Sequence, residues 1–264
     1  MKSISCSIVI PAYNEEQRLP FTLECILAYI KKSKWDAEVI VVNDGSRDDT
    51  AQIARNFSAR FAELRLLENL VNQGKGRSIR NGMLRATKEL VLFTDADNST
   101  PIEDAEKLIA AIHDGADVAI GSRWVNRRLQ LLPQPWYRRL NGRLYNRLLR
   151  TILGLDFRDT QNGFKAFTRQ AARAIFSPQR IAGWGFDAEA LFLARKLNLV
   201  VREVPVEYTY CAEGSKIHPY RDGARMLAEL LLVKWYSLTG TYFGKSHTTP
   251  PSPGKLSNLP MEQG

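Results

Sequence analysis

The chain has 264 residues, with 44% apolar and 25% charged side chains and a net charge of +9. This composition is typical of a globular protein that is large enough for one sizeable core. No apolar run approaches the roughly 20 residues that a helix needs to cross a bilayer, which argues against a membrane-spanning protein. The basic excess suits a polyanionic partner, whether nucleic acid, an anionic membrane surface or a phosphate-bearing substrate, and charge alone does not choose among them.

Short β-branched runs alternate with amphipathic stretches over the first 120 residues. This alternation predicts a doubly wound α/β fold, with a mostly parallel central sheet and flanking helices. Only Met1–Ser3 precede the first predicted strand, so we expect no signal or transit peptide and a cytoplasmic location. The predicted strands are Ile4–Ile10, Glu38–Asn43, Leu64–Glu68, Leu90–Thr94 and Asp117–Gly121.

The cysteines are Cys6, Cys25 and Cys211, an odd number without the spacing of a metal site. Cys6 lies within an apolar segment that is predicted to be a strand. We therefore expect all three to be reduced structural thiols, in keeping with a reducing compartment.

A helix start is marked after the fourth predicted strand. The tetrapeptide Thr100–Glu103 offers a threonine for the N-cap, a proline for the first turn and a glutamate for a capping box. We therefore predict that the loop from Asp95 to Ser99 is held rigidly before a helix.

Two further helices are predicted toward the C-terminus, over Trp136–Leu153 and Met226–Tyr236. The first is basic and amphipathic, with Trp136, Leu140, Leu144 and Leu148 on one side and most of its arginines elsewhere. A helix of this kind lies on an anionic membrane surface or presents a solvated face while it is docked on the protein, and both interpretations stay open. The last residues, 246–264, are rich in Pro, Ser and Gly, which predicts a disordered tail.

Two carboxylates, Asp95 and Asp97, follow the predicted strand Leu90–Thr94 with one small residue between them. Ligands of doubly wound sheets bind beyond the carboxyl ends of the strands, which is where these carboxylates are expected. A hard divalent cation, Mg²⁺ or Mn²⁺, would satisfy them and would bind a diphosphate. The alternative is a solvated acidic turn, which the predicted rigidity of the loop disfavours.

Other strand ends also carry polar groups. Tyr13 offers an aromatic face for stacking, and Asp44 offers a carboxylate to the ring nitrogen of a base, although Asp44–Ser46 also consists of ordinary turn formers. Lys75 lies at the start of a predicted helix, where the helix dipole and the ammonium favour phosphate, unless it is a plain loop lysine. No Gly-x-Gly-x-x-Gly motif follows the first strand, which counts against a dinucleotide enzyme.

These motifs together resemble glycosyltransferase family 2, of the inverting GT-A type. The blocks that match in order and spacing are Pro11–Glu15, Val42–Ser46, Gly74–Gly76, Asp95–Asp97 and Gly121–Arg123. Three later blocks resemble the branch that contains dolichyl-phosphate glucosyltransferases, with mannose synthases as cousins: Arg158–Lys165, Gly183–Glu189 and Glu213–Lys216. The resemblance covers nearly all of residues 4–240.

The resemblance implies one GT-A domain over residues 1–245. Its nucleotide-sugar half covers about 1–122 and its acceptor half about 123–245, followed by the tail 246–264. The implied reaction is transfer of a hexose, with glucose from UDP-glucose as first choice, to a polyprenyl or dolichyl phosphate in the presence of Mg²⁺ or Mn²⁺. We also expect peripheral contact with an anionic membrane at its cytoplasmic face and no nucleic-acid partner. Oligomeric state is not readable from the sequence.

Specific roles follow from the same resemblance. The residues implied to bind the nucleotide sugar are Pro11, Tyr13, Asn14, Glu15, Asp44, Lys75 and Asp95. Asp95 and Asp97 are the implied metal ligands, with Asp97 also catalytic. Ser99 stands where mannose synthases often place a further metal-binding glutamine, so the ligand set stays open. The residues implied to bind the acceptor or a phosphate are Arg123, Arg138, Gln161, Lys165 and Lys216, and surface charge is the alternative role for the two arginines and Lys216.

The identity of the acceptor decides whether a general base is needed. A polyprenyl phosphate is mostly a dianion at neutral pH and attacks without one, whereas a carbohydrate hydroxyl needs a carboxylate, for which Asp187 and Glu189 are the candidates. Asp159 either orients a substrate or is a structural partner of Arg158 or Arg123. Mannose from GDP-mannose is the alternative donor. A non-catalytic module that binds nucleic acid or an anionic membrane would leave Asp95 and Asp97 unexplained.

Overall fold

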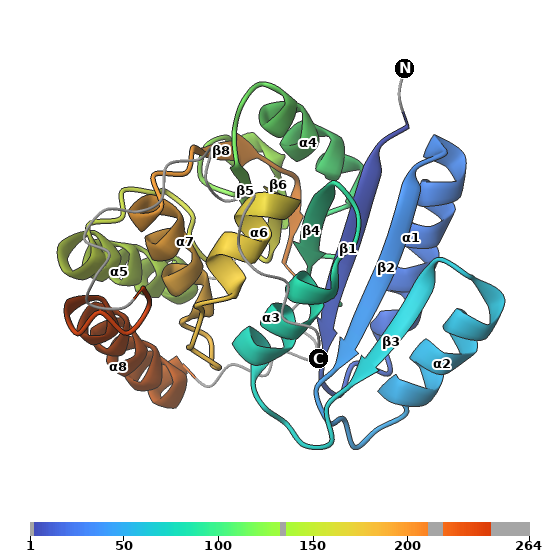
Figure 1. Ribbon diagram of the computed structural model, residues 1–264, viewed down its shortest axis with the longest axis horizontal. Coiled ribbons are helices and arrows are strands. Elements are labelled where there is room, and N and C mark those ends of the chain that lie inside the picture. Colours follow the sequence, from blue (N-terminus) through green and yellow to red (C-terminus); the bar gives the residue numbers. More distant parts are fainter. Residues whose placement is uncertain (1–2, 133–135, 211–218, 244–264) are drawn as a thin grey trace.

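A computed structural model describes residues 3–132, 136–210 and 219–243 (Figure 1). At its centre lies a seven-stranded sheet, in the order β3-β2-β1-β4-β7-β5-β8. The strands are β1 (Ser5–Ala12), β2 (Asp36–Asn43), β3 (Leu64–Glu68), β4 (Leu90–Thr94), β5 (Val118–Ser122), β7 (Phe164–Thr168) and β8 (Val201–Pro205). A second, two-stranded sheet pairs β6 (Gln130–Leu132) with β9 (Tyr208–Thr209).

One strand of the large sheet runs against the others. β7 is antiparallel to both of its neighbours, β4 and β5, while the remaining pairs are parallel. Thr94, the last residue of β4, is paired with Phe164, the first residue of β7. The segment that precedes β7 therefore reaches the same edge of the sheet at which the parallel strands end.

Helices cover both faces of the sheet. One face carries α1 (Leu19–Ser33), α2 (Thr50–Arg60) and α4 (Ala105–His113), which follows the 3₁₀ turn Ile102–Asp104. The other face carries α3 (Lys75–Arg85), α5 (Trp136–Leu153), α6 (Arg169–Phe176), α7 (Phe186–Lys196) and α8 (Pro219–Leu238). Figure 1 shows α5, α7 and α8 gathered on the side of the molecule opposite α1 and α2.

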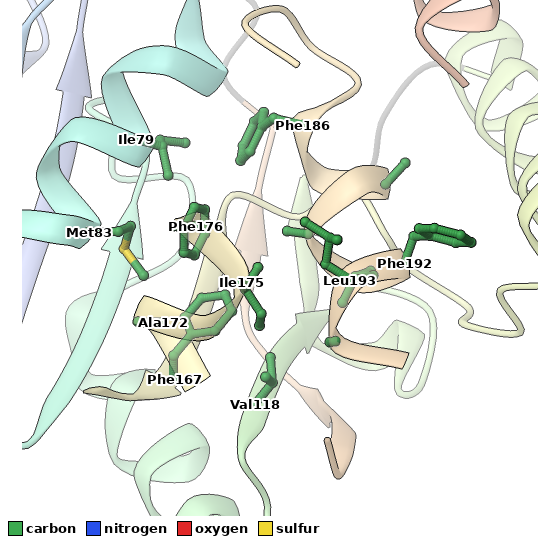
Figure 2. Close-up of a cluster of buried hydrophobic side chains, with 14 of the residues drawn as sticks. Ile79, Met83, Val118, Phe167, Ala172, Ile175, Phe176, Phe186, Phe192 and Leu193 are labelled. Atoms are coloured by element: carbon green, nitrogen blue, oxygen red, sulfur yellow. The ribbon is translucent and has the colours of Figure 1, made fainter. Parts of the chain in front are cut away.

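Strand residues alternate between the two cores, as the period of two in a β-strand requires. In β1, Ile8 and Ile10 pack on the α1 side while Val9 packs on the α3 side. Figure 2 shows the second core, in which side chains of α3, α6 and α7 meet those of β5 and β7. There the ring of Phe93 lies 5.8 Å from that of Phe186, so the core fixes the start of α7 against β4.

The predicted elements agree closely with the structure. β3 and β4 have the predicted bounds, and so does the basic helix α5. The fold class, α/β with a mostly parallel sheet, is confirmed. The predicted tail, 246–264, lies outside the described residues.

The predicted capping box at Thr100 is wrong. The chain enters α4 through the 3₁₀ turn Ile102–Asp104, which has no side-chain cap, and the buried hydroxyl of Thr100 has no hydrogen-bond partner. The Asp95–Ser99 loop is held by other contacts: the hydroxyl of Thr22 donates to the carbonyl oxygen of Ala96 at 2.8 Å. The loop is therefore fixed by α1 rather than by the helix that follows it.

Cys6 and Cys25 are free thiols, as predicted, and Cys211 lies outside the described residues. Burial raises the pKa of the Cys6 thiol to about 12, which leaves it inert at neutral pH. No helix in the described part of the chain is both long enough and apolar enough to span a bilayer.

Candidate functional site

The candidate site lies at the edge of the sheet where β1, β2 and β4 end. In a doubly wound sheet this edge holds the ligand, because loops diverge there on either side of the strand at which the order reverses. That strand is β1, with β2 on one side and β4 on the other. Since β7 begins at the same edge, the loop 159–163 joins the site as well.

The loops after β1 and β2 are bound to each other. Asn14 has the left-handed φ of 52°, and its backbone N–H donates to Ser46 Oγ at 2.9 Å while its side-chain oxygen accepts from the N–H of Arg47 at 2.8 Å. Glu15 donates its N–H to Thr50 and accepts from the guanidinium of Arg18. Pro11 is the last residue but one of β1 and is paired with Val42, and Tyr13 is half-buried in the loop that follows the strand. The predicted nucleoside-binding residues are thus brought together, while nucleoside binding itself stays a prediction.

Asp44 anchors the loop that leads into α3. Its side chain is 3% exposed and accepts from the side chain of Asn69 at 2.8 Å and from the N–H groups of Gln73 and Gly74, each at 2.9 Å. These hydrogen bonds show that Asp44 stabilises a turn, which is one of its two predicted roles. They also fix the place of Lys75, which follows Gly74. Binding of a base by Asp44 is a prediction that these contacts do not test.

Lys75, the first residue of α3, lies at the centre of the site. Its Nζ is 2.6 Å from Asp95 Oδ1 and 5.1 Å from the centre of the Trp184 ring. Burial of the ammonium lowers its pKa, but the carboxylates of Asp95 and Asp187 more than offset this effect and raise the pKa above the ordinary lysine value. Lys75 is therefore a firmly charged cation held between carboxylates and aromatic rings, and the plain loop lysine is excluded.

Asp95 and Asp97 lie close enough to influence each other. Burial first, and then the charge of Asp95, raise the pKa of Asp97, while the N–H of Ser99 donates to Asp97 at 3.0 Å. Asp95 packs directly on Gly163, where an added Cβ would collide with the Asp95 carboxylate. The glycine thus makes room for a carboxylate that must sit close to the backbone.

These two carboxylates fit a divalent cation. Their mutual repulsion is what a bound cation relieves, and carboxylate oxygens are the ligands that Mg²⁺ and Mn²⁺ prefer. Within the ranges that the structure describes, no group of three or more His, Cys, Asp or Glu side chains could hold a metal. A diphosphate and water are further oxygen ligands that a cation at Asp95 and Asp97 would accept.

Lys165 is a buried residue with partners inside the protein, and its predicted phosphate-binding role stays a prediction. The side chain is fully buried in β7, where its Nζ donates to Asp187 Oδ1 at 2.5 Å and to the carbonyl oxygen of Asn162 at 2.6 Å. A buried ammonium with these partners is satisfied within the protein. Lys165 holds Asp187 and the Asn162 loop in place.

The structure separates the two candidate bases on α7. Asp187 lies near Lys75 and is bound to Lys165, and burial raises its pKa although Lys165 and Lys75 act in the opposite direction. Glu189 points elsewhere: it is 0% exposed and accepts from the N–H groups of Arg180 and Ile181 and from the hydroxyl of Tyr242. A general base must reach the acceptor, so these contacts support a structural role for Glu189, and its predicted role as a base stays a prediction.

Arg123 and Asp159 form a buried bidentate pair. The guanidinium donates from Nε and from one terminal nitrogen to the two oxygens of Asp159, both at 2.7 Å, and its carbon lies 5.1 Å from the centre of the Tyr208 ring. Burial alone would raise the pKa of Asp159, but Arg123 holds it below the ordinary value. Of the alternatives for Asp159, pairing with Arg123 is therefore the one observed. Contact of Arg123 with a phosphate stays a prediction.

The remaining acceptor residues are placed only in part. Gln161 lies half-buried in the loop before β7, close in sequence to Gly163. Arg138 belongs to α5, although its side chain is outside the described ones, and Lys216 lies outside the described residues altogether. The acceptor roles of these three stay predictions.

Sequence reasoning missed three residues at the site. Trp184 lies under Lys75, Arg18 reaches to 3.9 Å from Asp97, and Gly163 supports Asp95. Trp184 and Gly163 both fall within blocks that carry the family resemblance, which was the available signal. For Arg18 the only signal was its spacing of three residues from Glu15.

Residues 7–176 match the family described as Glycosyl transferase family 2. A dolichyl-phosphate beta-glucosyltransferase from Drosophila melanogaster is 36% identical to this chain over 253 residues, which cover 91% of the chain and 77% of the relative. The dolichyl-phosphate beta-glucosyltransferase from Homo sapiens is 34% identical over 249 residues, which cover 89% and 76% respectively.

Among solved structures, the chain resembles glucosyl-3-phosphoglycerate synthase from Mycobacterium tuberculosis in complex with Mn²⁺, uridine diphosphate and glucosyl-3-phosphoglycerate. The TM-score is 0.65 at 19% identity, with 90% of this chain and 80% of the other covered. At that identity the likeness concerns the fold, and it agrees with the predicted GT-A architecture. The family match over residues 7–176 and the relatives that are similar over about nine tenths of the chain agree with this fold. The chain therefore belongs to glycosyl transferase family 2.

Proposed function

We propose that the chain is an inverting hexosyltransferase that moves glucose from UDP-glucose to the phosphate of a dolichyl or other polyprenyl phosphate, with a divalent cation. The observation that carries this proposal is the Lys75 cluster, in which one ammonium lies 2.6 Å from Asp95 beside Asp97 at the ligand-binding edge of the sheet. The relatives named dolichyl-phosphate beta-glucosyltransferase support the choice of donor sugar and acceptor.

The donor diphosphate is the group that this cluster suits. A cation held by Asp95 and Asp97 would offset the charge that grows on the departing diphosphate. Lys75 contributes through its ammonium rather than through the first amides of α3, because the N–H groups of Gly76 and Arg77 already donate to the carbonyl oxygen of Ala182. The side chain thus supplies a positive charge that α3 positions at the edge of the sheet.

A phosphate acceptor needs no general base. Its second pKa is about 6, so it is mostly a dianion at neutral pH, and its oxygen attacks the anomeric carbon from the face opposite the leaving group. The product is the inverted, β-linked sugar phosphate. Asp187 has no proton to remove in this reaction, which agrees with its short contact to Lys165.

Transfer to a carbohydrate hydroxyl is the second candidate, and one observation favours it. Asp187 is a buried carboxylate near Lys75, and burial raises its pKa. A general base works best when its pKa lies near neutral pH, so this shift suits such a role. The two reactions differ in their dependence on Asp187: hydroxyl transfer requires a carboxylate at this position, whereas attack by a phosphate dianion does not.

A lipid acceptor implies contact with a bilayer, and α8 supports such contact. Apolar side chains lie exposed on it at helical spacing: Leu227 at 38%, Leu231 at 56%, Trp235 at 61% and Leu238 at 74%. The neighbouring helix α5 packs on α8 and contains five arginines and no acidic residue. We infer that this apolar face of α8 lies on the surface of an anionic membrane, with its exposed side chains in the lipid and the basic helix α5 beside it.

Transfer of radiolabelled glucose from UDP-glucose to a polyprenyl phosphate in detergent tests the proposal directly. Mannose from GDP-mannose is run in parallel, and each donor is assayed with Mn²⁺ and with a chelator. We expect glucose to label the lipid only in the presence of the metal. Labelling by mannose instead would replace the donor, and hydrolysis of the donor without labelling of the lipid would favour a hydroxyl acceptor.

A further inference from the structure

A short turn, Gly183–Gly185, connects the catalytic edge with the helix α8. On one side it packs against the start of α3, where an added Cβ on Gly76 would lie 2.6 Å from Cβ of Phe186, the residue that follows the turn. On the other side it packs against Glu229, a residue of α8 that is 7% exposed. The turn therefore lies between the helix that begins with Lys75 and the helix that carries the apolar face.

Glu229 holds this turn through its carboxylate. Oε2 accepts from the backbone N–H of Gly185 at 2.7 Å, and Oε1 accepts from Arg225 Nε at 3.3 Å. An added Cβ on Gly185 would lie 2.8 Å from Oε2, and one on Gly183 would collide with Oε1. The two glycines thus leave the space that the carboxylate fills, which explains why a buried acid and a Gly-Trp-Gly turn occur together.

The turn carries two groups of the site. Its middle residue, Trp184, lies under the ammonium of Lys75, and Gly185 is the N-cap of α7, whose first turn contains Asp187. Both groups lie near the ammonium of Lys75. The N–H groups of Gly76 and Arg77 hold Ala182, just before the turn, against α3, and the hydrogen bond from Gly185 to Glu229 holds the other end of the turn against α8.

We propose that Glu229 is a positioning residue: from α8 it holds the Gly183–Gly185 turn and thereby sets the place of Trp184 and Asp187 around Lys75. This inference rests on the proposed hexosyl transfer for its kinetic test alone. A displaced turn would leave Lys75 without its aromatic neighbour at the point where the leaving diphosphate gains charge, and misplacement by about 1 Å costs up to about 100-fold in rate.

The first experiment compares three variants on α8. Glu229→Ala is expected to lower kcat at least about tenfold with a smaller change in the KM for the donor, because positioning acts in the transition state. Glu229→Gln should recover most of kcat, since its amide oxygen accepts from Gly185. Leu230→Ala is the matched control: Leu230 is fully buried on α8, so this variant lowers stability but should leave kcat unchanged.

The second experiment uses the glycine that faces Glu229. Gly183→Ala should lower kcat about as much as Glu229→Ala, because the new methyl group collides with the carboxylate. In the Glu229→Ala background the same substitution should cause little further loss, since the three atoms nearest to the added methyl group all belong to the Glu229 carboxylate. Gly223→Ala, on α8 with nothing within 4 Å of the added Cβ, controls for the exchange of glycine for alanine.

Tryptophan fluorescence tests the inference without any catalysis. Glu229→Ala should shift the emission of the protein, and the shift should be absent when Trp184 is replaced by Phe. Unchanged emission, equal loss of kcat in Glu229→Gln and Glu229→Ala, or an additive loss in the double variant would overturn the positioning role. Failure of the proposed function is distinguishable, because lipid labelling would then be absent in the unmodified protein while the emission shift persists.

Discussion

At the scale of single residues, the site depends on ionisable side chains that are buried with a partner. Lys75 is held by Asp95, Lys165 by Asp187, and Arg123 by Asp159. Asp97 has Ser99 and Arg18 as neighbours, but burial and the charge of Asp95 outweigh them and raise its pKa. A cation bound beside Asp97 would favour its ionised form.

Asp97→Ala is therefore expected to abolish turnover while the fold remains intact. The substitution removes a ligand of the proposed cation and relieves repulsion with Asp95, and it takes no side chain out of the core. Metal-dependent lipid labelling and thermal unfolding measure the two effects separately. Asp156→Ala is the matched control, since this carboxylate is 78% exposed and is paired with Arg150 rather than with a residue of the Lys75 cluster. Turnover that survived in Asp97→Ala would refute the metal assignment.

The Arg123–Asp159 pair predicts a pH-dependent contribution to stability. Because Arg123 lowers the pKa of Asp159 in the folded protein, the stabilisation is complete above the unfolded pKa of about 3.9 and is lost as the pH falls through the folded pKa. Breaking a buried pair costs about 3–5 kcal/mol. Asp159→Asn should thus lower the free energy of unfolding by about this amount near neutral pH.

Urea unfolding of the protein and of Asp159→Asn, at neutral pH and at about pH 3, measures that contribution. The difference between the two proteins should shrink at the acidic pH, because the unfolded chain then binds a proton at Asp159 while Arg123 disfavours that proton in the folded protein. A difference that stayed constant across this range would show that the carboxylate charge is not what stabilises Arg123.

At the scale of elements, α8 has two faces with different tasks. Its inner face packs Leu230 and Val233 into the core and presents Glu229 to the turn before α7. Its outer face exposes the apolar residues for which we infer contact with lipid. Binding to a membrane and the geometry around Lys75 therefore depend on the same helix.

Replacing Leu231 and Trp235 together by serine should weaken binding to vesicles of anionic lipid without loss of stability. Both side chains are more than half exposed, so their removal costs the fold little, whereas burial of each in lipid is worth about 1.5–3 kcal/mol. Vesicle co-sedimentation measures the binding. Phe21→Ser is the control, because Phe21 is 60% exposed on α1, on the other face of the sheet. Equal binding of all three proteins would exclude α8 as the contact.

The sequence predicted elements better than it predicted pairings. β3 and β4 have the predicted bounds because alternation of apolar residues is a local signal. The antiparallel strand β7 was not predicted, because its place between β4 and β5 depends on pairing between distant segments. The ion pair between its Lys165 and Asp187, 22 residues later, was missed because it also depends on long-range packing. Residue types at the site were predictable from motifs, whereas which charges meet in the interior depends on long-range packing.

At the scale of the whole molecule, the net charge of +9 and the apolar face of α8 favour the same partner. Salt should separate their contributions. The range of electrostatic attraction falls from about 10 Å at 0.1 M salt to about 3 Å at 1 M, whereas salt does not weaken apolar burial. Vesicle binding should therefore decline with salt but not vanish, and binding that did not respond to salt would exclude a role for the basic excess.

The antiparallel strand has a consequence for biosynthesis. β5 pairs only with β7 and β8, and β7 lies between β4 and β5 in the sheet. A nascent chain that has reached Ser122 has four strands that can pair and a fifth that has no neighbour to join. Until Thr168 leaves the ribosome, the apolar edge of β4 is an open template for wrong partners, so we expect that chaperones are needed most during this interval.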